Sequence, residues 1–187
     1  MITLSLDPSI RSCGIALWSD TELLLADRIQ LAAEHSDIAM RSLAMAHAVG
    51  TRARTHVQRI DTLVFEWPQI YTAVKSKGDP NDLIPMAGVG CALATMLGVS
   101  TVRAPHPADW IGQCPKVCPK CKGIRAKSCK LCSGSAWKTP RGRRIADALT
   151  QPERDRVPDQ HDVIDSVGLG AWWHGRLVLV RNFPGAV

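Results

Sequence analysis

The first thirty residues have the pattern of three β-strands separated by turns. Residues 2–7 alternate strictly and end at Asp7, where a Pro-Ser pair marks a turn. Residues 14–18 and 23–31 have the same strand-like character, with a Ser-Asp turn between them. We therefore predict that the chain begins with an antiparallel meander of three strands.

The period changes at Ser36, because apolar residues then recur at spacings of three and four as far as Ile60. This spacing predicts an amphipathic helix, and the apolar run over 62–66 predicts a short strand. Further predicted elements are a helix of small residues from near Asn81, a strand over 100–103, helices over 143–149 and 159–174, and a strand over 177–180. Strands followed by alternating helices and strands predict an α/β fold, a mixed sheet flanked by helices.

The composition is that of one folded domain over residues 1–187, because a chain of this length with 45% apolar residues can bury a sizeable core. No apolar run approaches the roughly 18 residues that a membrane helix needs. The first residues also lack the basic start and apolar stretch of a secretory signal. We expect a cytoplasmic protein without a membrane partner.

Four acids form a possible catalytic group. Asp7 and Glu66 end two predicted strands, while Asp162 and Asp165 project from one side of the last helix because they are three residues apart. Taken singly, each acid has a simpler role in a turn, at the surface or at a helix N-terminus. Together they predict carboxylates that converge at one sheet edge and need cations to balance their repulsion. Mg²⁺ or Mn²⁺ suits such ligands, and two such ions commonly hydrolyse phosphodiesters.

The acids lie in three segments that resemble the signature regions of RuvC-type Holliday junction resolvases, in the ribonuclease H-like superfamily: Leu4-Ser5-Leu6-Asp7-Pro8-Ser9, Val64-Phe65-Glu66 and His161-Asp162-Val163-Ile164-Asp165-Ser166. The resemblance implies a ribonuclease H-like fold in which all four acids are catalytic metal ligands and Asp7 bridges two ions. It also implies a homodimer, in a bacterium or the bacterial host of a virus, that nicks two strands of a four-way DNA junction symmetrically. His161 either supports catalysis or simply faces solvent.

Five of the seven cysteines lie between Cys114 and Cys132, and four of them form two CxxC pairs: Cys118 with Cys121 and Cys129 with Cys132. In a chain without an export signal, this spacing predicts a structural Zn²⁺ site rather than disulfides. A redox dithiol pair is the competing interpretation, and Cys114 is a spare thiol. We expect a zinc knuckle inserted over 114–138. The ordinary bacterial resolvases lack this insertion, which bears on junction docking rather than on the chemistry.

Positive charge is concentrated around these cysteines. The formal net charge is +6, and the segment between Trp110 and Ala146 has ten basic residues and no acid, while the rest has 13 basic against 17 acidic residues. Such a segment predicts a polyanionic partner, although a solubilising surface gives the same pattern. The residues expected to contact DNA are Lys75, Lys77, Lys120, Lys122, Arg125, Arg141, Arg143 and Arg144, with Tyr71 stacking on an unpaired base.

Together these features predict a metal-dependent DNA endonuclease that resolves four-way junctions. Two alternatives stay open. One is the RuvC-like nuclease of a transposon-type RNA-guided system, for which 187 residues leave little room for a guide-binding lobe. The other is a zinc-dependent nucleic-acid-binding protein without catalysis.

Overall fold

The computed structural model describes residues 1–32, 37–68, 83–112, 114, 116, 118–121 and 128–177. Its centre is a five-stranded sheet in the order β3-β2-β1-β4-β5. The strands are β1 (Ile2–Asp7), β2 (Ser12–Ser19), β3 (Glu22–Gln30), β4 (Thr62–Phe65) and β5 (Thr101–Arg103). Strands β1, β2 and β3 pair antiparallel, whereas β4 pairs parallel with both β1 and β5. The predicted meander and the mixed sheet are therefore confirmed.

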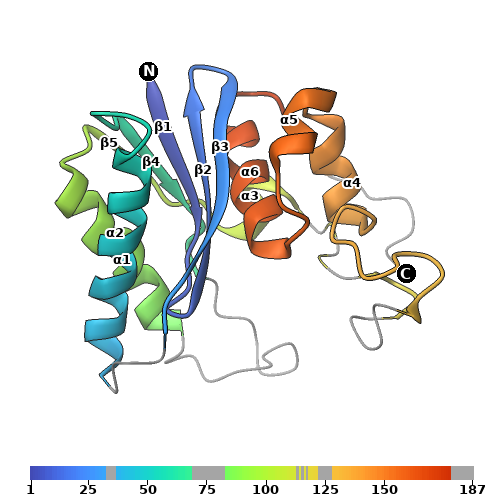
Figure 1. The fold of residues 1–187 in the computed structure, drawn as a ribbon, viewed down its shortest axis with the longest axis horizontal. Helices are drawn as coiled ribbons and strands as arrows, with labels where there is room; N and C mark the ends of the chain where they lie inside the picture. Colours follow the sequence, from blue (N-terminus) through green and yellow to red (C-terminus); the bar gives the residue numbers. More distant parts are fainter. Residues whose placement is uncertain are drawn as a thin grey trace.

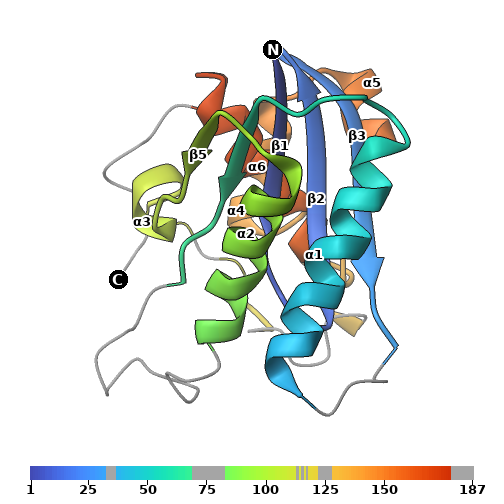
Figure 2. The ribbon, with the colours of Figure 1, turned by 90° about the vertical axis from the view of Figure 1, so that its left-hand side faces the viewer.

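Helices cover both faces of this sheet, giving three layers (Figure 1). One face carries α1 (Ile38–Arg54) and α2 (Leu83–Leu97), which lie in front of the sheet in Figure 2. The other face carries α6 (His161–Trp173), with α3 (Pro107–Trp110), α4 (Pro140–Asp147) and α5 (Gln151–Arg156) on the same side. No helix in the described ranges is long and apolar enough to cross a membrane.

Because both faces are covered, the two sides of the central strands enter two different apolar cores. Leu4 and Leu6 of β1 pack with Met45 of α1 on one side. Trp18 of β2 packs with Val167 of α6 on the other side. All five side chains are fully buried, so the central strands have apolar neighbours above and below.

Gly14 of β2 allows α6 to lie directly against the sheet. This glycine pairs with Asp7 in the strand register. A Cβ atom at Gly14 would overlap the backbone carbonyl of Asp162 at the start of α6, so only glycine permits the approach. The contact holds the first turns of α6, with Asp162 and Asp165, beside the carboxyl end of β1.

Several elements differ from the sequence prediction. Helix α1 ends at Arg54, although the apolar spacing continues to Ile60, because the residues after Arg54 pack on the core from a loop. Helices α3 and α5 lie in stretches for which no element was predicted. Each has a proline in its first turn and a capping box that stabilises a short helix. The predicted helix start at Ser36 lies outside the described residues. The same holds for the predicted strand over 177–180, of which only Leu177 is described.

Candidate active site and Cys₄ cluster

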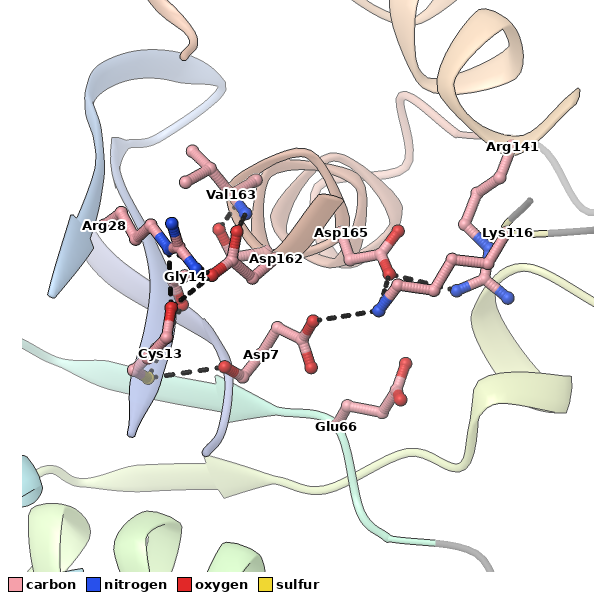
Figure 3. A network of polar contacts seen from close by, with 12 residues as sticks. Asp7, Cys13, Gly14, Arg28, Glu66, Lys116, Arg141, Asp162, Val163 and Asp165 are labelled. Atoms are coloured by element: carbon pink, nitrogen blue, oxygen red, sulfur yellow. Dashed lines mark hydrogen bonds and ion pairs between the residues drawn. The ribbon is translucent and has the colours of Figure 1, made fainter. Parts of the chain in front are cut away.

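The sheet topology brings Asp7 and Glu66 to the same edge. Asp7 is the last residue of β1, and Glu66 directly follows β4, the parallel neighbour of β1. The amide of Glu66 donates a hydrogen bond of 3.1 Å to the carbonyl of Leu6, which ties the two strand ends together. Helix α6 adds Asp165 from the layer above, so that three carboxylates face one space (Figure 3). We call Asp7, Glu66 and Asp165 the acid cluster.

In the described part of the chain, two basic residues contact the acid cluster. The Nζ atom of Lys116 lies 2.7 Å from Oδ2 of Asp165 and 3.4 Å from Oδ2 of Asp7, so it bridges two of the acids. Arg141 of α4 places its Nη1 atom 3.1 Å from the same Asp165 oxygen. Only 3% of the Asp165 side chain and 13% of the Asp7 side chain are exposed. A buried carboxylate without a cation is costly, and these two basic residues provide the compensating charge.

Burial and mutual repulsion nevertheless disfavour ionisation of the cluster. Burial is the largest cause of the shift that raises the pKa of Asp7 to about 6. Repulsion from Asp165 adds to the rise, whereas attraction by Lys116 opposes it. Burial, followed by repulsion from Asp7 and Asp165, raises the pKa of Glu66 to about 7. For Lys116, burial disfavours the charge, but attraction by Asp7 and Asp165 outweighs burial and raises its pKa. A further cation would therefore stabilise the acids, and their oxygen ligands fit Mg²⁺ or Mn²⁺.

Trp110 of α3 orients one of the acids. Its indole Nε1 donates a hydrogen bond of 3.0 Å to Oε2 of Glu66, and its side chain is fully buried. The guanidinium of Arg141 lies over the Trp110 ring, 5.8 Å from its centroid, and also donates to the carbonyl of Cys114. Trp110 and Arg141 thus connect Glu66, beside the sheet, with Asp165 in α6.

Asp162 is turned away from the acid cluster. Its Oδ2 atom accepts a hydrogen bond of 2.6 Å from Oγ of Ser12. The same atom accepts a hydrogen bond of 2.8 Å from Nε of Arg28 (Figure 3). Ser12 begins β2 and Arg28 lies on β3, so these bonds fasten the start of α6 to the meander. The structure therefore brings three of the four predicted acids together and pairs the fourth with a basic residue. The role of Asp162 as a metal ligand stays a prediction.

The four cysteines of the two CxxC pairs form a compact group, which we call the Cys₄ cluster. One ligand atom from each of Cys118, Cys121, Cys129 and Cys132 lies within 4.8 Å of the others. Within the described part of the chain, no other group of three or more His, Cys, Asp or Glu residues is gathered this closely. Backbone amides of Cys132 and Leu131 lower the pKa of Cys129 to about 6, which favours the thiolate that a metal ion needs.

The backbone after Cys132 reverses direction, as a metal knuckle requires. Ser133 has a φ of 53° and Gly134 a φ of 82°, so two consecutive residues adopt the left-handed conformation. Glycine adopts this conformation without strain, which explains its position two residues after Cys132. The Cys₄ cluster is compatible with a zinc knuckle.

The remaining predicted residues are distributed as follows. His161, Lys120 and Arg143 are exposed, and Arg144 is partly buried. Arg141 points inward to Asp165, and Cys114 is buried in the core beside α6 rather than in the Cys₄ cluster. The other predicted DNA contacts, Tyr71, Lys75, Lys77, Lys122 and Arg125, lie outside the described residues. Sequence reasoning did not assign Trp110, Ser12 or Arg28 to the site, and it counted Lys116 only among the basic residues.

Solved structures with a similar arrangement identify the fold. The chain is similar to Thermus thermophilus RuvC, with a TM-score of 0.55 at 14% identity, and to T. thermophilus RuvC in complex with a Holliday junction substrate, with a TM-score of 0.51 at 12% identity. Each match covers 92% of both chains. A yeast mitochondrial Holliday junction resolvase matches with a TM-score of 0.48 at 10% identity, over 94% of this chain and 79% of that one. No family model and no curated protein matches the sequence. The prediction of the fold is confirmed: the five-stranded mixed sheet flanked by helices is the ribonuclease H-like fold of RuvC.

Proposed function

We propose that this protein is a metal-dependent endonuclease that cuts four-way DNA junctions. The acid cluster carries the proposal, because three largely buried carboxylates from β1, the end of β4 and α6 face one space, and the pKa values of Asp7 and Glu66 stay raised despite the two basic residues that contact the cluster in the described part of the chain. The fold supports it, since one of the similar structures holds a Holliday junction substrate. A fold alone accommodates many activities, and therefore the acids rather than the fold define the chemistry.

Asp7, Glu66 and Asp165 would hold two divalent ions, either Mg²⁺ or Mn²⁺. Such a pair of ions activates water and stabilises the leaving oxygen of a phosphodiester. The chain's own residues keep the ligands in place: Trp110 orients Glu66, and Arg141 orients Asp165. We propose Asp162 as the fourth ligand, which requires its ion pair with Arg28 to open.

We propose that the Cys₄ cluster binds a structural Zn²⁺ ion. Three of its cysteines form a small buried group of their own, with Cys121 packed against them, so coordination would supply much of the local folding free energy. Substitution Cys121→Ser removes one of the four ligands. We expect the purified variant to lose stoichiometric zinc in elemental analysis, and full zinc content in this variant would contradict the four-ligand site.

The exposed basic residues suit a DNA backbone. Lys120 in the insertion and Arg143 on α4 are exposed, and we propose that they contact phosphates together with the other predicted basic residues. Junction affinity should then fall steeply with added salt, because bound phosphates release counterions. A binding constant that does not respond to salt would contradict this role.

A second copy of the chain would allow symmetric nicking of two strands. Helices α1 and α2 leave an apolar groove of about 490 Å³ at one end, where Ile38, Leu43 and Ile84 are exposed by 52%, 49% and 68%. We propose this groove as the homodimer contact, since an exposed apolar surface of this kind favours association. Light scattering should show a dimer for the wild type and a monomer for Ile84→Glu; an unchanged dimer would place the contact elsewhere.

Cleavage of a synthetic four-way junction in Mg²⁺, without RNA, tests the function. The wild-type protein should cut the junction and leave a linear duplex of the same sequence intact. The Asp7→Asn variant should bind the junction but not cut it, because binding depends on basic residues and not on the acids. Cleavage that requires a guide RNA would favour the RNA-guided alternative, and wild-type binding without cleavage would favour the non-catalytic alternative.

A further inference from the structure

Lys116 belongs to the segment that joins α3 to the Cys₄ cluster, two residues before Cys118. Its ammonium group lies between acids from two different elements, 2.7 Å from Oδ2 of Asp165 and 3.4 Å from Oδ2 of Asp7 (Figure 3). Asp7 lies 109 positions before Lys116 and Asp165 lies 49 positions after it, so both contacts join segments that are far apart in the sequence.

The insertion therefore reaches into the acid cluster.

Both sides of this lysine are anchored. On one side, the carbonyl of Cys114 accepts two hydrogen bonds of 3.3 Å from Arg141, and Cys114 is only 2% exposed. On the other side, Cys118 is 2% exposed and belongs to the Cys₄ cluster. Two residues of extended chain span at most about 7 Å, so a folded Cys₄ cluster keeps the backbone of Lys116 close to the acids.

The ammonium group uses the carboxylate oxygens that a divalent ion would need. Both ion pairs of Lys116 are made to Oδ2 atoms, one of Asp7 and one of Asp165. An ion bound between these acids would meet the positive charge of Lys116 at close range, and like charges at this separation repel strongly where water is scarce. Lys116 and a divalent ion therefore exclude each other from the space between Asp7 and Asp165.

We propose that Lys116 is a tethered cation of the acid cluster, which divalent metal must displace from Asp7 and Asp165, so that the Cys₄ insertion sets the metal affinity of the active site. This inference rests on the proposed function, because it concerns the same acids. It gives the insertion a role in the chemistry, in addition to the docking role expected from the sequence. Because 43% of the Lys116 side chain is exposed, the displaced ammonium group has an open path to solvent.

Titration with Mn²⁺, followed by the electron paramagnetic resonance signal of the free ion, tests the proposal without any cleavage assay. The full-length zinc-loaded chain is compared with Lys116→Met, Lys116→Arg and Lys138→Met at one pH and one ionic strength. Lys138 is an exposed lysine of the same basic segment and serves as the matched control. Lys116→Met should bind Mn²⁺ at least roughly tenfold more tightly than the wild type, because a competing charge is removed. Lys116→Arg and Lys138→Met should stay close to the wild type.

Zinc content and thermal unfolding of each variant show that the comparison is made between folded proteins. Wild-type binding of Mn²⁺ with unchanged or weaker binding by Lys116→Met would overturn the tethered-cation proposal and leave the proposed function intact. Tighter binding by Lys138→Met as well would also overturn it, because the effect would then come from net charge. Absence of Mn²⁺ binding in the wild type and in Lys116→Met would overturn the metal site itself, and with it the proposed function.

Discussion

Buried carboxylates occur near both ends of the central strand β1, and their pKa values are shifted in opposite directions at the two ends. At the carboxyl end, Asp7 and Glu66 have pKa values raised to about 6 and about 7. Near the other end, beside the turn between β2 and β3, Glu153 of α5 has a pKa lowered to about 2, mainly by its hydrogen bonds with Arg176. The two ends therefore contain the same kind of group in opposite electrostatic states.

The difference lies in how many partners the chain itself provides. Arg176 donates two hydrogen bonds of 2.6 Å to Glu153, one to each oxygen, and Thr150 adds two more from its amide and hydroxyl. Arg176 also lies over the ring of Trp18, which fixes the guanidinium against the sheet. Glu153 is thus satisfied by protein groups alone and joins α5, the end of α6 and the meander. Among the described residues, the acid cluster instead has three acids against two basic residues, Lys116 and Arg141, and such an excess of acid is expected of the metal site proposed here.

The largest expected effect is on junction cleavage, which should depend on the acid cluster and not on Glu153. Asp165→Asn should lower Mg²⁺-dependent junction cleavage by roughly a thousandfold or more, because a ligand of the catalytic ions is lost. Glu153→Gln should cut at the wild-type rate per folded molecule, since Glu153 lies at the other end of the sheet. Single-turnover cleavage of a labelled junction measures both rates. Cutting at the wild-type rate by Asp165→Asn would remove this acid from the proposed ligand set.

The free energy of unfolding should depend most on the ion pair between Glu153 and Arg176. Arg176→Met leaves Glu153 buried without its cation, and breaking a buried pair in this way costs about 3 to 5 kcal/mol of unfolding free energy. Arg59→Met is the matched control, because Arg59 is 79% exposed in its ion pair with Asp61 and such a pair contributes roughly 1 kcal/mol or less. Urea unfolding at neutral pH measures both values. Equal losses in the two variants would show that the Glu153 pair does not hold the fold.

The pH dependence should also differ between the ends. Because the folded-state pKa of Glu153 is about 2 against an ordinary value of 4.5, its stabilisation is complete above pH 4.5 and is lost as the pH falls toward 2. This loss is about 3 kcal/mol in the wild type, and Glu153→Gln should not show it. Unfolding free energies measured from pH 6 down to pH 2.5 test the difference. Parallel curves for the two proteins would contradict it.

The last expected effect is a gain in stability at the acid cluster. The folded-state pKa of Glu66 is about 7, above its ordinary value of 4.5, so the stability it contributes is present below pH 4.5 and is lost as the pH rises through 7. Without added Mg²⁺ or Mn²⁺ at pH 8, Glu66→Gln should therefore be more stable than the wild type, by up to about 3 kcal/mol. Thermal unfolding at pH 8 and pH 4.5 checks this, with the difference confined to the higher pH. A variant less stable at pH 8 would show that ionised Glu66 stabilises the fold.

Much of this protein could be predicted from local patterns in its sequence. The strict alternation over residues 2–7 and the strand-like segments 14–18 and 23–31, separated by turn residues, predict the meander. The two CxxC pairs predict the Cys₄ cluster, because each pair presents two thiolates from one tight turn. Asp7 and Glu66 could be placed at one sheet edge, since each ends a predicted strand and parallel neighbours end on the same side.

Only the tertiary structure decided which charges meet. Lys116 contacts Asp7 across 109 residues, and Arg28 contacts Asp162 across 134, although no periodic pattern connects either pair. The sequence placed Asp162 with the other acids by helical spacing, but the close approach at Gly14 sets this residue beside Ser12 and Arg28. Periodicity reports how each segment buries its apolar face, whereas the partners of a polar side chain depend on how the segments pack, and packing is a property of the whole chain.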